Sequence, residues 1–154
     1  MKHGLYDPAF ERDACGVGLV ANVDGSRSHE IIDQALQVLV NLGHRGACGS
    51  DPETGDGAGI LIQTPHAFFK TEAERIGIDL PEPGRYGVGM IFLPRHEDVR
   101  ARCEDAMRFA VEGEDLLLLG WRDVPVSPDA IGRLARANMP VIRQCFVGAP
   151  DSMD

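Results

Sequence analysis

The sequence predicts a mixed fold in which a β-sheet is covered by helices. Apolar runs typical of strands alternate along the chain with segments whose apolar residues recur at helical spacing. The chain has 154 residues, about the length of one domain, and no repeat, low-complexity tract or obvious linker divides it. The alternation does not decide whether the strands are parallel or antiparallel.

Short apolar runs bounded by turn residues indicate the strands. The first run opens at Cys15, directly after a polar segment, and ends before the turn signal Asp24-Gly25. We expect strands over residues 15–23, 60–62, 86–93, 115–121 and 141–147.

The first helix is expected between Ser28, which suits an N-cap, and Gly43, which suits a helix stop. Its apolar residues predict one buried face, made of Ile31, Ala35, Val38, Leu39 and Leu42. Further helices are expected over residues 65–76, which begin with proline, 97–111 and 128–137. The apolar side of the 97–111 helix is predicted to consist of Val99, Cys103, Ala106, Met107 and Ala110.

The composition is typical of a soluble globular protein and excludes several classes of function. Asp and Glu number 24 against 15 Lys and Arg, which gives a formal charge of −9. Neither a nucleic-acid partner nor an anionic membrane surface is expected, because both require a basic face. The acidic pairs of the 97–111 helix, such as Glu104-Asp105, are interpreted as solvated charge, and Trp121 as a packing residue.

The cysteines and the N-terminus predict a cytoplasmic, thiol-reduced protein. The four cysteines form no C-x-x-C pair, so a metal cluster has little support. Residues 1–14 contain charged side chains and no apolar stretch, so they do not resemble a signal peptide.

Three places in the sequence are candidates for chemistry: Cys15, the segment His44-Arg45-Gly46-Ala47, and residues 51–60. Residues 43–59 include six glycines, but their spacing fits neither a phosphate-binding loop nor a dinucleotide motif. From the residues alone, a turn-rich connection, a buried strand cysteine and a helix-end arginine remain open as alternatives.

Taken together, these segments resemble the class II, or N-terminal-nucleophile, glutamine amidotransferases, and among them the large subunit of glutamate synthase. The resemblance rests on three segments: Ala14-Cys15-Gly16-Val17-Gly18, His44-Arg45-Gly46-Ala47, and Asp51-Pro52-Glu53-Thr54-Gly55-Asp56-Gly57-Ala58-Gly59-Ile60. It implies an α+β fold, the four-layer αββα sandwich of antiparallel sheets, of which this chain would build only part. It also implies that residues 1–14 are a leader and residues 15–154 the N-terminal part of a glutaminase domain.

The resemblance gives Cys15 the role of nucleophile toward the amide of glutamine. The base in this class is the free α-amine of the same cysteine, so the leader would have to be removed. Arg45, Gly46, Asp56 and Gly57 would support the site, with Asp56 ordering its own loop by hydrogen bonds. His44 is expected to be structural.

One part of the family's site is missing from the sequence. The class uses an Asn-Gly pair to stabilise the oxyanion, and this chain has Asn22-Val, Asn41-Leu and Asn138-Met but no Asn-Gly. We therefore expect an incomplete domain without useful glutaminase activity on its own, either a truncated product or part of a split subunit. The alternative is a non-catalytic binding or regulatory module that keeps the scaffold.

The resemblance also implies the cofactors and partners. No cofactor or metal is expected in this chain, whereas FMN and an iron–sulfur cluster are expected in the other domains of a parent synthase. The expected partners are glutamine and those remaining domains, or a split-subunit partner. An incomplete sheet would leave unpaired edges, so poor solubility or dimerisation is expected.

Overall fold

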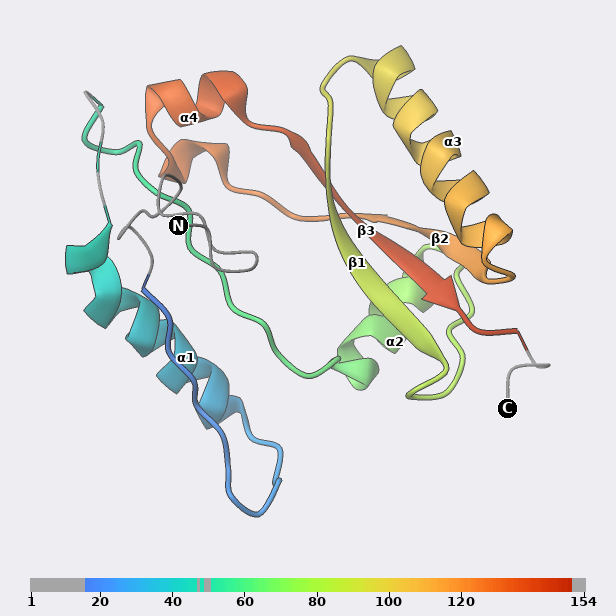
Figure 1. Ribbon diagram of the computed structural model, residues 1–154, viewed down its shortest axis with the longest axis horizontal. Helices are drawn as coiled ribbons and strands as arrows, with labels where there is room; N and C mark the ends of the chain where they lie inside the picture. The colour runs from blue at the N-terminus through green and yellow to red at the C-terminus, as the bar shows by residue number, and fades with distance from the viewer. Residues whose placement is uncertain (1–15, 47, 49–50, 151–154) are drawn as a thin grey trace, which may run out of the picture. The chain divides into compact units, whose positions relative to one another are not determined.

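The structure, a computed structural model, describes residues 16–46, 48 and 51–150. They form two compact units, shown in Figure 1. The first unit comprises the chain up to residue 62 together with residues 129–136, and the second comprises residues 63–128 together with the chain from residue 137 onward. Each unit is described separately.

The second unit is built on a three-stranded antiparallel sheet. Its strands are β1 (Tyr86–Leu93), β2 (Leu117–Asp123) and β3 (Val141–Gly148), in the order β1-β3-β2. Val88 lies opposite Phe146 across the β1–β3 pair, and Trp121 lies opposite Cys145 across the β2–β3 pair. The prediction for β1 is confirmed, β3 extends one residue further than predicted, and β2 begins and ends two residues later than predicted.

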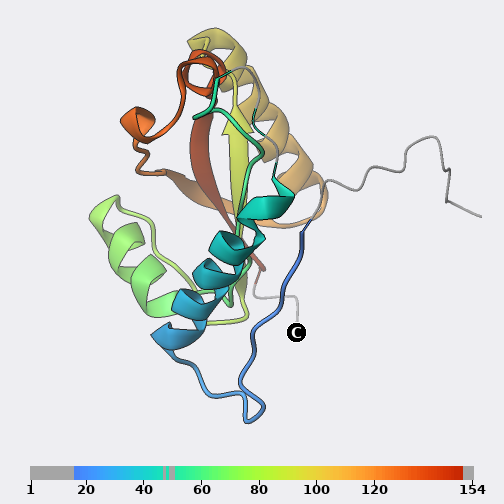
Figure 2. The ribbon, with the colours of Figure 1, turned by 90° about the vertical axis from the view of Figure 1, so that its left-hand side faces the viewer.

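Helices α2 (His66–Arg75) and α3 (Glu97–Gly113) cover opposite faces of this sheet, as Figures 1 and 2 show. The core lies on the α2 side, where the rings of Phe69 and Phe146 meet edge to face at a centroid distance of 5.4 Å. This arrangement of aromatic rings is favourable beyond the burial of their surface. The core consists of Phe69, Ala73, Leu80 and Phe146, with Ile78, Tyr86, Val88 and Leu119 packed against it.

The covered side of α3 differs in part from the prediction. Cys103 and Met107 are half-buried, whereas Val99, Ala106 and Ala110 are exposed. The covered side of the helix consists of Arg100, Cys103, Glu104, Met107 and Val111. The interpretation of Glu104 as solvated charge is wrong, because its Oε1 lies 2.7 Å from Nη1 of Arg143 on β3.

The first unit contains helix α1 (His29–Asn41), which continues into the 3-10 turn η2 (Leu42–Arg45). The predicted apolar side of α1 is confirmed: Ile31, Ala35, Val38, Leu39 and Leu42 are half-buried, together with Ile32. Ser28 occupies the N-cap position, although its side chain makes no capping hydrogen bond. The 128–137 helix is interrupted, because η3 (Pro128–Ala130) and α4 (Arg133–Asn138) are separated by Ile131 and Gly132.

Two predicted strands are absent from the part of the first unit that the structure describes. Residues 16–22 and 60–62 form no strand, Val23 already belongs to the turn that follows, and Val17, Leu19 and Leu61 are at least 90% exposed. An apolar run becomes a strand only where a neighbouring strand completes its hydrogen bonds. The sheet of the second unit, with a helix on each face, supports the α+β class, while the second sheet of a four-layer sandwich stays a prediction.

None of the helices that the structure describes is long and apolar enough to cross a membrane.

Candidate functional site

Two glycines that follow Cys15 bring the chain into direct contact with α1. Cys15 itself lies outside the described residues. A Cβ atom on Gly16 would lie 3.1 Å from Cδ2 of Leu42, and one on Gly18 would collide with Cγ1 of Val38. A side chain at position 18 would therefore displace Val38, whereas one at position 16 would require only a small shift of the Leu42 side chain. Because Leu42 begins the turn that ends at Arg45, this packing connects the segment after Cys15 with the His44-Arg45 motif.

The turn η2 carries His44 and Arg45 at the end of the helical segment. The Nδ1 atom of His44 lies 2.9 Å from the carbonyl oxygen of Asn41, which supports the structural interpretation of this histidine. The N–H of Gly46 donates to the carbonyl of Gly43 at 3.2 Å and closes the turn. Arg45 is exposed, and a cation at a helix C-terminus is favoured by the helix dipole. The turn therefore fixes the backbone position of Arg45.

The start of the glycine-rich segment is ordered by Asp51. Its Oδ2 accepts from the Thr54 hydroxyl at 2.9 Å and its Oδ1 from the Glu53 N–H at 3.3 Å. The backbone carbonyl of Asp51 accepts from the Thr54 N–H at 2.9 Å. These bonds give Asp51 a loop-ordering role like the one that the sequence assigned to Asp56, five residues later.

The end of the glycine-rich segment has more free space around it than its start. A bridge between Cys48 and Gly55 closes the loop that contains Asp51. Asp56 and Gly57 follow this bridge and are exposed. Gly57 and Gly59 do not adopt a positive φ, and a Cβ on either would meet nothing within 4 Å. The packing of the described residues therefore does not require glycine there, and a ligand or another chain segment has room to approach.

Asp51 and Thr54 also bind the first turn of α4. The N–H of Leu134 donates to Oδ2 of Asp51 at 3.1 Å, and the N–H of Ala135 donates to Oγ1 of Thr54 at 3.3 Å. Sequence reasoning missed this connection across some eighty residues. The only local signal was Gly132, which lies inside the predicted 128–137 helix and can break it.

These donors keep Asp51 ionised. The pKa of its carboxyl is lowered chiefly by the Leu134 amide, then by the Thr54 hydroxyl, with a smaller contribution from the charge of Arg133. Partial desolvation acts in the opposite direction and is outweighed. The carboxylate therefore acts as an acceptor at neutral pH.

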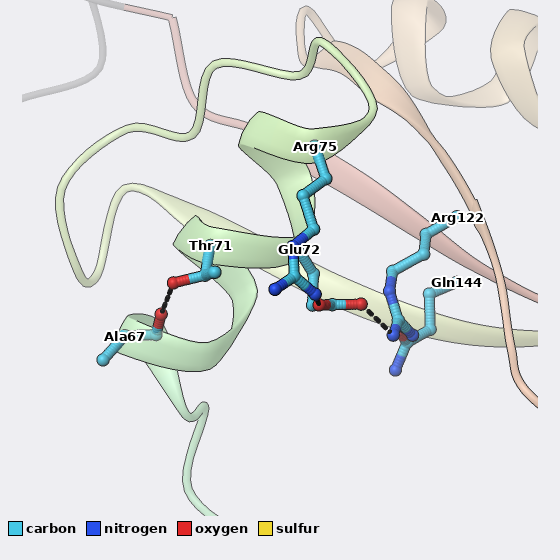
Figure 3. Close-up of polar contacts among 6 residues, drawn as sticks. All are labelled: Ala67, Thr71, Glu72, Arg75, Arg122 and Gln144. Atoms are coloured by element: carbon cyan, nitrogen blue, oxygen red, sulfur yellow. Dashed lines mark hydrogen bonds and ion pairs between the residues drawn. The ribbon is translucent and has the colours of Figure 1, made fainter.

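A second polar cluster, drawn in Figure 3, lies in the second unit and joins α2 to the sheet. Arg122 on β2 donates to Oε2 of Glu72 at 2.6 Å and to Oε1 of Gln144 at 3.0 Å. Its guanidinium also lies 5.4 Å from the ring centroid of Phe68, within the range of a cation–π interaction. Arg75 contacts the other oxygen of Glu72 at 2.5 Å. This cluster has a structural role, since its polar groups satisfy one another and hold the helix to β2 and β3.

Among residues 16–46, 48 and 51–150, no group of three or more His, Cys, Asp or Glu could hold a metal ion. The thiols of Cys48, Cys103 and Cys145 are free and lie on separate segments. Burial raises the pKa of the Cys145 thiol, so this buried cysteine is a core residue rather than a reactive one. These three thiols do not form the ligand set of an iron–sulfur cluster.

The segment after Cys15, the His44-Arg45 turn and the loop ordered by Asp51 all lie within a stretch that matches a known protein family. Residues 15–154 match the class II glutamine amidotransferases, and the chain belongs to this family.

Among its relatives, the chain is similar to glutamate synthases. It is 49% identical over 150 residues to the glutamate synthase [NADPH] large chain of Bacillus subtilis, covering 97% of this chain and 10% of the relative. It is 44% identical to the glutamate synthase [NADH] of Saccharomyces cerevisiae, covering 93% of this chain and 7% of the relative. It is 42% identical to the ferredoxin-dependent glutamate synthase 2 of Arabidopsis thaliana, covering 93% of this chain and 9% of the relative. The chain thus spans a tenth or less of the length of these relatives.

Proposed function

We propose that the chain supplies the nucleophile and the adjoining loops of a glutaminase site of the kind that serves glutamate synthases. The observation that carries this proposal is the match to the class II glutamine amidotransferases, which begins at Cys15 and extends to residue 154. The contact of Gly16 with Leu42 supports it, because it joins the segment after Cys15 to the turn that carries Arg45.

In the proposed reaction, the Cys15 sulfur attacks the amide carbon of glutamine. The thiol proton passes through the α-amine of Cys15 to the leaving nitrogen, which departs as ammonia while a thioester forms. Water then attacks the thioester and releases glutamate and the thiol. A free α-amine has a pKa of about 7.7 to 8.0, which suits proton transfer near neutral pH. The mechanism therefore requires that residues 1–14 are removed.

Four further residues are proposed to support the site. Arg45 and Gly46 would maintain the geometry beside the nucleophile, and Asp56 and Gly57 would form the opposite loop. All four are exposed, so a ligand can reach them. Neither His44 nor Asp56 is given a proton-transfer role.

The oxyanion hole is not provided by these 154 residues, because they contain no Asn-Gly pair. Loss of one oxyanion donor typically lowers the rate by about 10²–10³-fold, so we propose that this chain alone has no useful glutaminase activity. We further propose that residues 15–154 form part of a four-layer αββα sandwich, and that other domains of a synthase, which would carry FMN and an iron–sulfur cluster, are its partners. The cytoplasmic location rests on the sequence and stays a prediction.

A segment exchange tests the proposal. The segment of the Bacillus subtilis large chain that matches this chain is replaced by residues 15–154, and glutamine-dependent release of glutamate is measured. We expect the chimera to be active, Cys15→Ser to abolish the activity, and Cys48→Ser, the matched change at an exposed cysteine, to preserve it. Activity that survives Cys15→Ser would refute the proposal.

The absence of Asn-Gly favours one second candidate, a non-catalytic binding or regulatory module on the same scaffold. Mass spectrometry of the purified chain distinguishes the two. A mature chain that begins at Cys15 supports the glutaminase, whereas retention of Met1 together with an inactive chimera supports the module.

A further inference from the structure

Helix α4 begins without a capping side chain of its own. Gly132 precedes the first helical residue, Arg133, and therefore occupies the N-cap position. An N-cap side chain normally accepts the N–H groups of the second and third helical residues. Glycine has none, so the N–H groups of Leu134 and Ala135 need acceptors from elsewhere in the chain.

The acceptors come from the start of the glycine-rich segment. Asp51 accepts from Leu134 at 3.1 Å and Thr54 accepts from Ala135 at 3.3 Å. The carbonyl of Glu53 accepts the N–H of Gly132 at 2.9 Å. The Thr54 hydroxyl donates to Asp51 at 2.9 Å, so the two acceptors also support each other. We refer to Asp51, Glu53, Thr54 and Gly132 with these bonds as the α4 clamp.

The packing at Gly132 shows how closely the two segments approach. Gly132 is buried. A Cβ there would lie 2.7 Å from Oδ2 of Asp51 and 2.7 Å from the carbonyl carbon of Glu53, and would collide with Oγ1 of Thr54. One of these neighbours is backbone, so a side-chain rotation could not relieve the contact. Residues 51–54 pack directly on the start of α4. This packing leaves no room for a side chain at Gly132 and supplies the acceptors that a capping side chain would otherwise provide.

The clamp fixes the chain immediately before the proposed site. Thr54 is adjacent to Gly55, which is bridged to Cys48, and Gly55 leads directly to Asp56 and Gly57. We infer that Asp51 and Thr54 are positioning residues, which hold the Asp56-Gly57 loop in place by capping α4. This inference rests on the proposed glutaminase function and extends it to residues that would not touch the substrate.

The test compares two substitutions of Thr54 that differ in whether they keep the hydroxyl group. Thr54→Val keeps the shape but removes both the hydroxyl donor and the acceptor, whereas Thr54→Ser keeps the hydroxyl. Thr71→Val is the matched control, because the Thr71 hydroxyl donates within α2, to the Ala67 carbonyl at 3.1 Å (Figure 3). Each variant is measured for kcat and KM toward glutamine in the chimera and for melting temperature in the chain itself.

We expect Thr54→Val to lower kcat/KM by about tenfold to a hundredfold, as misplacement of a site by about 1 Å does. Thr54→Ser is expected to restore kcat/KM to within about twofold, a recovery that depends on the hydroxyl. Thr71→Val should leave kcat/KM unchanged. Equal kcat/KM for Thr54→Val and Thr71→Val would overturn the positioning role, and so would a Thr54→Ser variant that is as impaired as Thr54→Val.

A second measurement separates failure of the clamp from failure of the proposed function. In the chain itself, the amide resonances of Gly55 and Gly57 should shift in Thr54→Val and return in Thr54→Ser. Unchanged resonances would overturn the clamp, whatever the chimera does. An unmodified chimera without glutaminase activity would refute the proposed function, and the resonances would still decide whether the clamp holds the loop.

Discussion

Replacement of Gly120 by alanine is expected to destabilise the second unit strongly. Gly120 lies in β2 at an irregularity of the strand register between Leu118 and Gly120. Its φ of 157° is a conformation that side chains rarely adopt. A Cβ atom there would lie 2.5 Å from Cδ1 and 2.9 Å from Cγ1 of Ile78, a residue that packs against the core.

The expected effect is the sum of two terms. A non-glycine residue held in a sparsely populated backbone conformation costs about 1–3 kcal/mol. The additional methyl group in a packed site costs about 1–3 kcal/mol more. Gly120→Ala should therefore lower the free energy of unfolding by about 2–6 kcal/mol, a large part of the stability of an ordinary domain.

Urea unfolding followed by far-UV circular dichroism measures this loss. Gly87→Ala is the matched control, because Gly87 lies in the same sheet with open space around its Cα and no positive φ; its effect should stay within about 0.5 kcal/mol. Ile78→Val removes Cδ1, so adding it to Gly120→Ala should recover part of the packing term. A Gly120→Ala variant within about 0.5 kcal/mol of the unmodified chain, or no recovery from Ile78→Val, would refute the reasoning.

Three further substitutions test other parts of the structure. Asp115 has a φ of 56° two residues after the end of α3, so Asp115→Gly should raise the free energy of unfolding by about 0.5–1 kcal/mol; a decrease in urea stability would contradict this. The hydrogen bond from Arg122 lowers the pKa of Glu72 in the folded chain. The Glu72 carboxylate therefore stabilises the fold above its unfolded pKa of about 4.3, and this stabilisation is lost as the pH falls through its pKa in the folded chain. Glu72→Gln should flatten the decline of urea stability below that pH, and an unchanged slope would argue against the contribution. Gly18→Ala places a methyl group against Val38 and should cost about 1–3 kcal/mol, which Val38→Ala should partly restore; additive effects of the two changes would show that they are not in contact.

The first helix was predicted accurately because its signals are local. The spacing of Ile31, Ala35 and Val38 depends only on the helical period, and these residues are half-buried as predicted. The side of α3 was placed imperfectly because periodicity counts only apolar residues. Glu104 lies on the covered side through its bond to Arg143, and no apolar pattern reports an ion pair.

Strands and the site depend on distant partners, which explains the remaining differences. The apolar run at residues 60–62 predicts a strand equally well whether or not a neighbour pairs with it. The motifs containing Arg45 and Asp56 were visible in the sequence, but the bonds between Asp51 and α4 join residues 83 positions apart in the chain. No local pattern encodes such a connection. The one local indication is Gly132, a helix-breaking residue inside the predicted 128–137 helix.

The two sides of the segment after Cys15 have different surroundings. Gly16 and Gly18 lie against α1, whereas Val17 and Leu19, which alternate with them along the chain, are about 90% exposed. A strand of the proposed four-layer sandwich has a helix on one side and a second sheet on the other, so these apolar side chains are the ones that such a sheet would cover.

Leu19→Lys should therefore change the melting temperature of this chain little but should abolish glutamate release in the chimera, where a lysine would be buried between the sheets. Val40→Lys, at a 71% exposed position on α1, serves as the control and should be tolerated in both. If Leu19→Lys leaves the chimera as active as Val40→Lys does, the second sheet does not cover this side of the segment, and the sandwich must be assembled differently or not at all.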